Sequence, residues 1–269
     1  IEVVFAKRPR MLSSTGSVRR LAVAVSLVAM VLPGLAAANP MMVVDVGSGR
    51  VIAHQEAFRK WYPASLTKLM TAYTTFRSMR TGELSPETVV VMSKHAADQP
   101  ASKMYFKPGS KLTLDSALKL LIIKSANDVA VAIGETVSGS EGAFVQRMNQ
   151  EAQRLGMTST RFVNPNGLPG KGQYTTARDM ALLAATIRRE FPEYAGYFAL
   201  EGVTTGKKDY PNFNLLVGRF PGADGMKTGY VCASGFNQVS SATRNGRTVI
   251  SVVLGADSLG ARADLSAEL

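Results

Sequence analysis

Three short motifs carry side chains that could together perform acyl transfer. They are Ser65-Leu-Thr-Lys68, Ser125-Ala-Asn127 and Lys227-Thr-Gly229. A serine hydroxyl attacks a carbonyl efficiently only when a base removes its proton. An amine three residues further along a helix lies on the same face as the hydroxyl, within reach of it. The spacing therefore makes Ser65 a candidate nucleophile and Lys68 its candidate base.

The candidate base has a protonation problem that its surroundings must solve. An ordinary lysine, with a pKa of about 10.4, is almost fully charged at neutral pH and cannot accept a proton. Lys68 could act only if burial or a nearby cation lowered its pKa by about 3 units, and Lys227 is the candidate cation. A position at a helix N-terminus would also favour negative charge developing on Ser65.

The other polar side chains of the motifs have candidate roles in the same scheme. Ser125 would relay the proton, Asn127 would bind a substrate amide and Thr228 would bind a substrate carboxylate. Each motif alone is weak, because it could equally be a helix cap, a solvated charge or a turn, and Ser-x-x-Lys also occurs at Ser116–Lys119. Their order and context favour the joint catalytic interpretation.

Hydrophobic periodicity and turn residues indicate the elements that would position the motifs. Two short β-prone runs, 41–46 and 50–53, flank a glycine-rich turn and predict a β-hairpin. Apolar residues at three- and four-residue intervals predict helices, and β-branched runs predict strands. Helices are expected over about 65–80, 113–124, 128–137, 142–155, 176–189 and from 259 onward, and strands over 213–217, 236–242 and 248–254.

The order of these elements predicts an α/β (α+β) fold. Strand-like segments lie at both ends of the chain and surround a long helical stretch, so one sheet built from the two ends with a helical insertion accounts for the order. Lys227-Thr-Gly229 falls in the strand-rich C-terminal part. Thr176, with Asp179 three residues later, is expected to cap the helix that follows it.

The composition is that of an ordinary globular protein, with 269 residues, 46% of them hydrophobic and 19% charged. The apolar content excludes a disordered chain. One cysteine, Cys232, excludes an intrachain disulfide framework and is expected to be a free thiol, and only two histidines argue against a metal centre. We expect no cofactor. The formal net charge of +11 suggests an anionic partner, but basic runs interleaved with aromatics are missing, so nucleic acid is not expected.

The N-terminal segment has the layout of a secretory signal peptide. A basic pair, Arg19-Arg20, precedes an apolar run and a small-residue end at Ala38. The apolar run of about 12 residues is short of the roughly 20 that span a bilayer as a helix. We expect residues 1–38 to be a signal peptide with upstream residues, cleaved after Ala38, with retention as a membrane anchor as the alternative. Residues 39–269 would then be one exported domain, periplasmic or otherwise extracytoplasmic.

Several longer segments resemble one known family. They are Pro63-Ala-Ser-Leu-Thr-Lys-Leu-Met70, Ser125-Ala-Asn-Asp128, Gly167-Leu168, Tyr174-Thr-Thr-Ala-Arg-Asp-Met180 and Asp224-Gly-Met-Lys-Thr-Gly229. The chain is similar over these segments to the penicillin-binding D-alanyl-D-alanine carboxypeptidases of the serine transpeptidase-like superfamily, from about Met42 to its end. Ser-x-x-Lys and Lys-Thr-Gly are also motifs of class A β-lactamases.

The resemblance implies a β-lactamase/transpeptidase-like fold of two lobes, an antiparallel sheet flanked by helices and an all-α lobe, with the active site between them. It implies removal of the terminal D-alanine from peptidoglycan stem pentapeptides through an acyl-Ser65 intermediate, with β-lactam antibiotics acylating the same serine. The oxyanion hole would come from the backbone N–H groups of Ser65 and Tyr230. The substrate-binding residues that it implies are Asn127, Lys227, Thr228, Gly229, Tyr230 and Arg262.

Three alternatives remain open. A D,D-endopeptidase that cuts peptidoglycan cross-links would use the same machinery in a wider cleft. A class A β-lactamase uses a glutamate between the second and third motifs, and the segment 160–168 contains no acidic residue. A cell-wall-binding protein without catalytic activity would not need the reactive side chains.

The sequence departs from the family pattern in two places. Tyr230 stands where some close relatives carry histidine, which bears on the rate of deacylation. No C-terminal β-domain or amphipathic anchor helix follows Leu269. We therefore expect either a short type of the family or a truncated chain, and leave peripheral contact with a membrane open.

Overall fold

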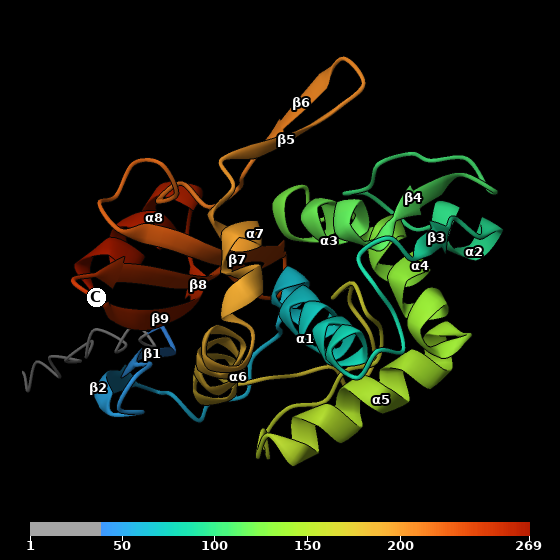
Figure 1. Cartoon of the computed structure of the whole chain (residues 1–269). Helices are drawn as coiled ribbons and strands as arrows, with labels where there is room; N and C mark the ends of the chain where they lie inside the picture. The colour runs from blue at the N-terminus through green and yellow to red at the C-terminus, as the bar shows by residue number, and fades with distance from the viewer. Residues whose placement is uncertain (1–38) are drawn as a thin grey trace, which may run out of the picture. The chain divides into compact units, whose positions relative to one another are not determined.

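The two ends of the described chain, residues 39–269, meet in one five-stranded antiparallel sheet in the computed structural model (Figure 1). The first strand pairs with the last, and the strand order is β2-β1-β9-β8-β7. The strands are β1 (Met41–Asp45), β2 (Val51–Gln55), β7 (Ala223–Val231), β8 (Gly235–Arg244) and β9 (Arg247–Ala256). The predicted signal peptide and its upstream residues, 1–38, lie outside the described residues.

The chain between β2 and β7 contains every helix of the described residues except α8. The α-helices of the described residues are α1 (Thr67–Arg80), α2 (Lys94–Ala97), α3 (Leu114–Ile123), α4 (Asn127–Ser138), α5 (Glu141–Arg154), α6 (Ala177–Glu190), α7 (Ala195–Ala199) and α8 (Leu259–Glu268), and the 3-10 helices are η1 (Ala64–Leu66) and η2 (Pro192–Tyr194). Two small two-stranded sheets pair β3 (Val89–Val91) with β4 (Lys111–Thr113) and β5 (Gly202–Thr205) with β6 (Lys208–Pro211). None of the helices within residues 39–269 is long and apolar enough to cross a membrane.

Helices cover both faces of the five-stranded sheet, because successive side chains of a strand point to opposite faces. Ile250, Val252 and Leu254 of β9 belong to the main core, on the face where α6 packs. Ser251 points the other way and donates to the carbonyl of Ser266 on α8 at 3.4 Å. An antiparallel sheet with flanking helices, joined to a further helical region, confirms the predicted fold class.

Helix α1 lies among the other helices and follows directly from the turn that carries the first motif (Figure 1). It packs against α3, α4, α5 and α6, and twelve of its fourteen residues are buried. Leu69, Met70 and Phe76 belong to the same hydrophobic core as Val239 and Val252 of the sheet. Because burying each such side chain stabilises a fold by roughly 1.5–3 kcal/mol, the core fixes α1 against both the helices and the sheet.

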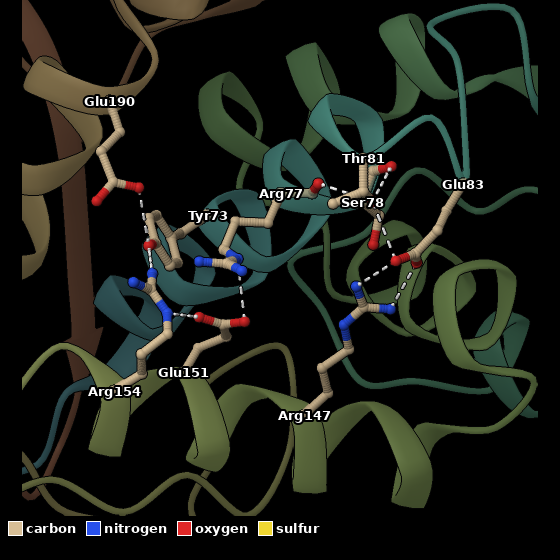
Figure 2. A network of polar contacts seen from close by, with 9 residues as sticks. All are labelled: Tyr73, Arg77, Ser78, Thr81, Glu83, Arg147, Glu151, Arg154 and Glu190. Atoms are coloured by element: carbon tan, nitrogen blue, oxygen red, sulfur yellow. Dashed lines mark hydrogen bonds and ion pairs between the residues drawn. The ribbon is translucent and has the colours of Figure 1, made fainter.

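Polar contacts to α5 and α6 fix the outer side of α1 (Figure 2). Glu151 on α5 pairs with Arg77 of α1 at 3.1 Å and with Arg154 at 2.7 Å. Arg154 also donates to the hydroxyl of Tyr73, which donates in turn to Glu190 at the end of α6 at 3.1 Å. Burial raises the pKa of the Tyr73 hydroxyl, so this hydroxyl keeps its proton and remains a donor.

Most of the elements expected from periodicity are present. The N-terminal hairpin, the central helices and the last two strands are confirmed within a few residues. Thr176 caps α6 by accepting from the N–H of Asp179 at 3.1 Å, as expected. Strand β7, which contains Lys227-Thr-Gly229, was not delimited by the pattern, because its two glycines and polar residues resemble a turn.

The predicted strand over 213–217 is wrong, because this segment forms turns. The side-chain oxygen of Asn212 accepts from the N–H of Asn214 at 2.9 Å, and that of Asn214 accepts from the N–H of Leu216 at 3.1 Å. Asparagine side chains that bond the backbone two residues later replace the ladder of a strand with a turn. The Asn214 amide also donates to the carbonyl of Gly225 at 2.7 Å, which ties the turn to β7.

Candidate active site

Ser65 lies in η1, the single 3-10 turn that leads into α1. Lys68 lies one turn further, and its Nζ donates to Ser65 Oγ at 3.1 Å. The residue before the serine, Ala64, has a φ of 49° and turns the chain sharply at the entrance of the helix. The pair that the Ser-x-x-Lys spacing predicts is thus formed by local backbone geometry.

Lys68 Nζ is surrounded by three oxygen atoms. Besides Ser65 Oγ, it contacts Asn127 Oδ1 at 2.7 Å and the backbone carbonyl of Asn166 at 2.5 Å. A neutral amine has two N–H groups and one lone pair, and a carbonyl oxygen can only accept. When Lys68 is neutral, the two carbonyl oxygens take its N–H groups. The lone pair is then left for the one neighbour that can donate, the Ser65 hydroxyl.

The electrostatics of the site favour the neutral form of this lysine. Lys68 is only 1% exposed, and burial, followed by repulsion from Lys227, holds its pKa well below the ordinary lysine value, against an opposing effect of Asp128. Burial and then the charge of Arg262 lower the pKa of Lys227 to about 7. Burial alone lowers the pKa of Arg262 to about 10. The site therefore holds three buried basic groups, in which the charge of Lys227 acts on Lys68 and the charge of Arg262 acts on Lys227.

The second motif lies in the connection between α3 and α4. Ser125 has a φ of 57° and lies at the tight turn between the two helices. Asn127 is the first residue of α4, and its Nδ2 donates to the carbonyl of Pro100 at 2.9 Å. The buried carboxylate of Asp128 accepts from the backbone N–H groups of Met104 and Tyr105, which fixes the loop opposite. Sequence reasoning did not assign that role to Asp128.

Two glycines pack against the backbone that holds the nucleophile. A Cβ on Gly167 would lie 1.9 Å from the carbonyl oxygen of Ala64, and a Cβ on Gly229 would lie 2.9 Å from Ser65 N. Gly167 also has a φ of 84°, in the region that favours glycine. The loop containing Asn166 and strand β7 can approach the serine turn this closely only because both carry glycine at the contact.

The motif residues gather around one cavity of about 290 Å³. Its walls include seven of the nine predicted site residues: Ser65, Ser125, Asn127, Thr228, Gly229, Tyr230 and Arg262. The two lysines do not line it. Lys68 and Lys227 are 1% and 2% exposed and lie beneath the surface that a ligand would touch. The cavity thus presents hydroxyl, amide and guanidinium groups, with the amines behind them.

Arg262 reaches the cavity from α8, far from the other motifs in sequence. Its Nη2 donates to the carbonyl of Phe213 at 3.1 Å, whereas its Nε, also buried, has no hydrogen-bond partner among the described residues. Lys227 Nζ donates to the carbonyl of Thr228 at 3.0 Å. A buried guanidinium with an unused donor, beside a hydroxyl that lines the same cavity, suits an anionic ligand.

One wall of the cavity is aromatic. Tyr230 is 51% exposed, and its ring packs on Phe236 with 4.5 Å between centroids. Cys232 is a free and exposed thiol, as expected, and its Sγ lies 3.8 Å from the Tyr230 hydroxyl.

The second Ser-x-x-Lys, at Ser116–Lys119, has a structural role. Thr113 caps α3 by accepting from the N–H of Ser116 at 3.2 Å and donates its hydroxyl to that of Ser116 at 2.9 Å. Lys119 pairs with Asp115 at 2.8 Å. Neither Ser116 nor Lys119 lines the cavity of about 290 Å³.

One contact of the site, the carbonyl of Asn166 on Lys68, carried no side-chain signal in the sequence. Every residue has such a carbonyl, so residue type cannot reveal it. The neighbouring Gly167-Leu168 was one of the segments that resemble the family, and it marks the same loop.

Comparison with known proteins identifies similar sequences over most of the chain. Residues 29–258 match the model of the peptidase S11 family, described as D-alanyl-D-alanine carboxypeptidase. D-alanyl-D-alanine carboxypeptidase DacC of Escherichia coli K12 is 38% identical over 226 residues, which cover 81% of this chain and 56% of that protein. DacF of Bacillus subtilis is 34% identical over 223 residues, 81% of this chain and 57% of that protein. The chain therefore spans a little over half the length of these relatives.

Solved structures of penicillin-binding proteins share the fold. Penicillin binding protein 5 from Haemophilus influenzae has a TM-score of 0.83 and 33% identity, covering 87% of this chain and 69% of that chain. Penicillin-Binding Protein D2 from Listeria monocytogenes, solved in an ampicillin-bound form, has a TM-score of 0.77 and 29% identity, covering 86% and 96%. These likenesses agree with the predicted transpeptidase-like fold.

Proposed function

Because the chain belongs to the D-alanyl-D-alanine carboxypeptidase family, peptidase S11, we propose that it removes the terminal D-alanine from peptidoglycan stem pentapeptides. The observation that carries the proposal is the contact of Lys68 Nζ with Ser65 Oγ at 3.1 Å, inside a site that depresses the lysine pKa. The proposed reaction is a serine acyl transfer followed by hydrolysis.

Substrate binds along β7 in this proposal. β7 ends the sheet, so its outer edge is free to pair with an extended peptide. The terminal carboxylate lies at Thr228 and Arg262, and the presence of both side chains in the walls of the cavity supports the assignment. Asn127, with one N–H of its amide engaged by Pro100, offers the other N–H to a substrate carbonyl.

Acylation begins when Lys68 removes the proton of Ser65. The serine oxygen attacks the carbonyl carbon of the penultimate D-alanine, and the oxyanion binds to the backbone N–H groups of Ser65 and Tyr230. The packing of Gly229 against Ser65 N supports this placement, because it brings the backbone of β7 beside the backbone of η1. The proton passes through Ser125 to the leaving nitrogen, the C–N bond breaks and D-alanine leaves.

Deacylation repeats the steps with water in place of serine. Water attacks the ester carbonyl and gives one proton to the same relay. The ester C–O bond then breaks, the relay returns that proton to Ser65 Oγ, and the shortened peptide leaves. Penicillins acylate Ser65 by the same attack on the β-lactam carbonyl. The ampicillin-bound relative from Listeria monocytogenes supports this part of the proposal.

The proposed place of action is outside the cytoplasm, where peptidoglycan is found, and the signal-peptide pattern of residues 19–38 supports export. A β-lactamase of class A would need a carboxylate in the loop that follows the second motif. Here that loop offers Lys68 a backbone carbonyl, from Asn166, which favours the carboxypeptidase.

Incubation with a labelled penicillin, followed by mass spectrometry of the adduct, tests the proposal. The wild-type protein should carry one adduct on Ser65, Ser65→Ala should carry none, and the matched control Ser116→Ala should be labelled like the wild type. The wild type should also release D-alanine from a defined pentapeptide. An adduct on Ser116 or Ser125 contradicts the proposed nucleophile. Cleavage of a cross-linked dimer without cleavage of the pentapeptide would instead indicate the D,D-endopeptidase.

A further inference from the structure

Strand β7 begins with a carboxylate that the proposed chemistry does not use. Asp224 is the second residue of β7 and lies three residues before Lys227. Its Oδ1 accepts from Ser241 Oγ at 2.5 Å, and its Oδ2 accepts from Thr243 Oγ1 at 2.6 Å. Oδ2 also accepts from Nη2 of Arg188, on α6, at 2.7 Å. One side chain of β7 is therefore bonded to both β8 and α6.

These bonds form at a break in the pairing of β7 with β8. Ala223 and Gly225 pair with consecutive residues of β8, so Asp224 between them is the extra residue of a β-bulge. In a regular ladder Asp224 would share a face with Thr228, because the side chains of a strand alternate. The bulge lets its carboxylate reach Ser241 instead, on the face of the sheet where α6 packs. The bulge and the bonds of the carboxylate therefore depend on each other.

The bulge decides which face each later residue of β7 presents. Beyond it, the pairing with β8 is continuous from Gly225 to Val231. In this register Lys227 is 2% exposed and lies behind the cavity, whereas Thr228 lines it. A shift of one residue would exchange these faces, because the side-chain period of a strand is two. The register of β7 therefore decides whether the amine or the hydroxyl meets a ligand.

Two further contacts enclose the bulge. The Asn214 amide donates to the carbonyl of Gly225 at 2.7 Å. A Cβ on Gly225 would lie 2.7 Å from the Cβ of Phe198 on α7, so the backbone of the bulge lies directly against that helix. These contacts restrict the room around the bulge, while Asp224 supplies its side-chain bonds to β8.

Arg188 makes the negative charge of Asp224 necessary. The side chains of Arg188 and Asp224 are 11% and 23% exposed, so both are largely shielded from water. Among residues 39–269, Asp224 is the one carboxylate that forms an ion pair with Arg188, and Arg188 Nη1 is buried without a hydrogen-bond partner. Removing the carboxylate would leave a buried charge uncompensated, which destabilises the packing of α6 beside the bulge.

We propose that Asp224 is a positioning residue of the active site: bonded to β8 and α6, it holds the bulge that keeps Lys227 behind the cavity and Thr228 in its wall. The proposal rests on the proposed acyl transfer at Ser65, since the register of β7 matters through that reaction. Asp224 does not line the cavity of about 290 Å³, so it acts through the backbone of β7 and not on the substrate.

Asp224→Ala removes the anchor, and Asp45→Ala is its matched control. Asp45 also accepts from a serine hydroxyl and pairs with an arginine, Arg247, but it joins β1 to β9. Asp224→Ala should lower the single-turnover rate of acylation by a labelled penicillin about 100-fold, the loss expected when groups of a site move by about 1 Å. Asp45→Ala should be labelled at the wild-type rate.

The pH dependence of acylation separates positioning from a loss of stability. The charged groups that act on Lys68 are Lys227 on β7 and Asp128 on α4, and Arg262 on α8 acts on Lys227. A loss of register turns Lys227 away from Lys68, which raises the pKa of Lys68 and moves the acylation profile to higher pH. Asp224→Ala should show this upward shift. A variant that is merely less stable keeps the wild-type profile in its folded fraction.

Thr243→Val tests the same anchor with a milder change. Valine has a shape similar to threonine but cannot donate to Asp224. This variant should lower the acylation rate about tenfold, the loss that corresponds to one hydrogen bond to a charged group, with a shift of the profile in the same direction. Added to Asp224→Ala, it should have no further effect, because the hydroxyl then has no carboxylate to hold. If Asp224→Ala shows no unfolding transition in urea, Thr243→Val decides alone.

The proposal is overturned if Asp224→Ala keeps the wild-type rate, or if it loses acylation without a shift of the profile. Equal losses in Asp45→Ala, or additive effects of Asp224→Ala and Thr243→Val, overturn it as well. Failure of the proposed function looks different, because the wild type itself would then carry no label on Ser65 and release no D-alanine.

Discussion

At the scale of single residues, the surroundings of Lys68 set both the position and the protonation of its amine. Two carbonyl oxygens, from Asn127 and Asn166, hold its nitrogen beside Ser65, and burial together with Lys227 disfavours its charge. Geometry and electrostatics therefore act on one atom, since the neutral amine has one lone pair and one neighbour able to donate to it. A substitution that removes the charge of Lys227 should therefore shift the protonation equilibrium of Lys68 without moving its atoms.

Lys227→Gln should shift the pH dependence of acylation upward. Repulsion from Lys227 lowers the pKa of Lys68, so removing that charge raises it, and a higher pH is then needed for the neutral base. The measurement is the single-turnover rate of acylation at saturating substrate, because binding and chemistry are otherwise mixed. Lys207→Gln is the control and should leave the profile in place. An unchanged profile in Lys227→Gln would mean that burial alone activates Lys68.

Arg262→Ala should weaken cleavage of a free C-terminal D-alanine more than that of an amidated analogue. Arg262 lines the cavity, and a hydrogen bond between charged groups contributes about 1.5–3 kcal/mol, so its loss should lower kcat/KM roughly 10- to 100-fold. Steady-state kinetics on the matched pair of substrates gives the comparison. Equal losses on both substrates would remove Arg262 from carboxylate recognition.

Residue type and spacing in the sequence predicted side chains that the fold brings together, while their catalytic roles stay predictions. Ser65 and Lys68 could be paired because residue type and helical spacing together define their chemistry, and the contact of 3.1 Å follows. Asn166 could not be assigned, because it acts through a carbonyl that every residue has. Ser116 and Lys119 match the same spacing, and only the fold shows that Ser116 bonds the cap residue Thr113 while Lys119 pairs with Asp115.

At the scale of elements, the site depends on how closely three segments approach. Turn η1, the loop around Gly167 and strand β7 meet at the backbone of Ser65, with a glycine on each side. Their close approach places the strand that would bind substrate beside the serine amide. Any side chain at these glycines would separate the segments.

Gly167→Ala should lower the acylation rate by about 100-fold, because a displacement of about 1 Å in a catalytic group costs that much. Gly109→Ala is a matched control. Gly109 has the same φ of 84° and nothing within 4 Å of its Cβ position. Both variants should lose about 1–2 kcal/mol of stability to the left-handed backbone, but only Gly167→Ala should lose acylation. Equal acylation in the two variants, measured with labelled penicillin, would contradict the role of the close contact.

The two departures from the sequence patterns, at β7 and at 213–217, have different physical reasons. β7 carries Gly225 and Gly229, which lower strand propensity, yet pairing with β8 along its length makes it a strand. The segment 213–217 has apolar residues typical of a strand, yet the side chain of Asn214 bonds the backbone and makes a turn. Tertiary pairing decides the first case and local side-chain bonds decide the second.

In the whole molecule, the buried basic groups reduce stability at neutral pH. The pKa of Lys227 is about 7 in the folded state and about 10.4 in the unfolded state, so the unfolded chain binds more protons between these values. The free energy of unfolding therefore rises with pH across this window, by about 2 kcal/mol between pH 7 and pH 9 from this residue alone. The protein should be more stable in mild alkali than at neutral pH as far as Lys227 is concerned.

Urea denaturation of the wild type and of Lys227→Met at the two pH values measures this contribution. The variant should show a smaller rise, because methionine fills much of the same space and carries no proton. Lys207→Met, at an exposed position, should behave like the wild type. If the wild type and Lys227→Met rise equally, Lys227 is charged in the folded protein.

The open edge of β7 has a further consequence, for the colloidal behaviour of the protein. An edge strand that is open for the proposed substrate peptide can also pair with a strand of another molecule, which is how sheets start to aggregate. Here η1 and α7 pack against β7, and Tyr230 is an exposed aromatic near its end. They limit the length of edge that a second copy could use. A substrate groove built from a sheet edge must therefore stay short, and concentrated protein should precipitate more slowly when a peptide ligand occupies it.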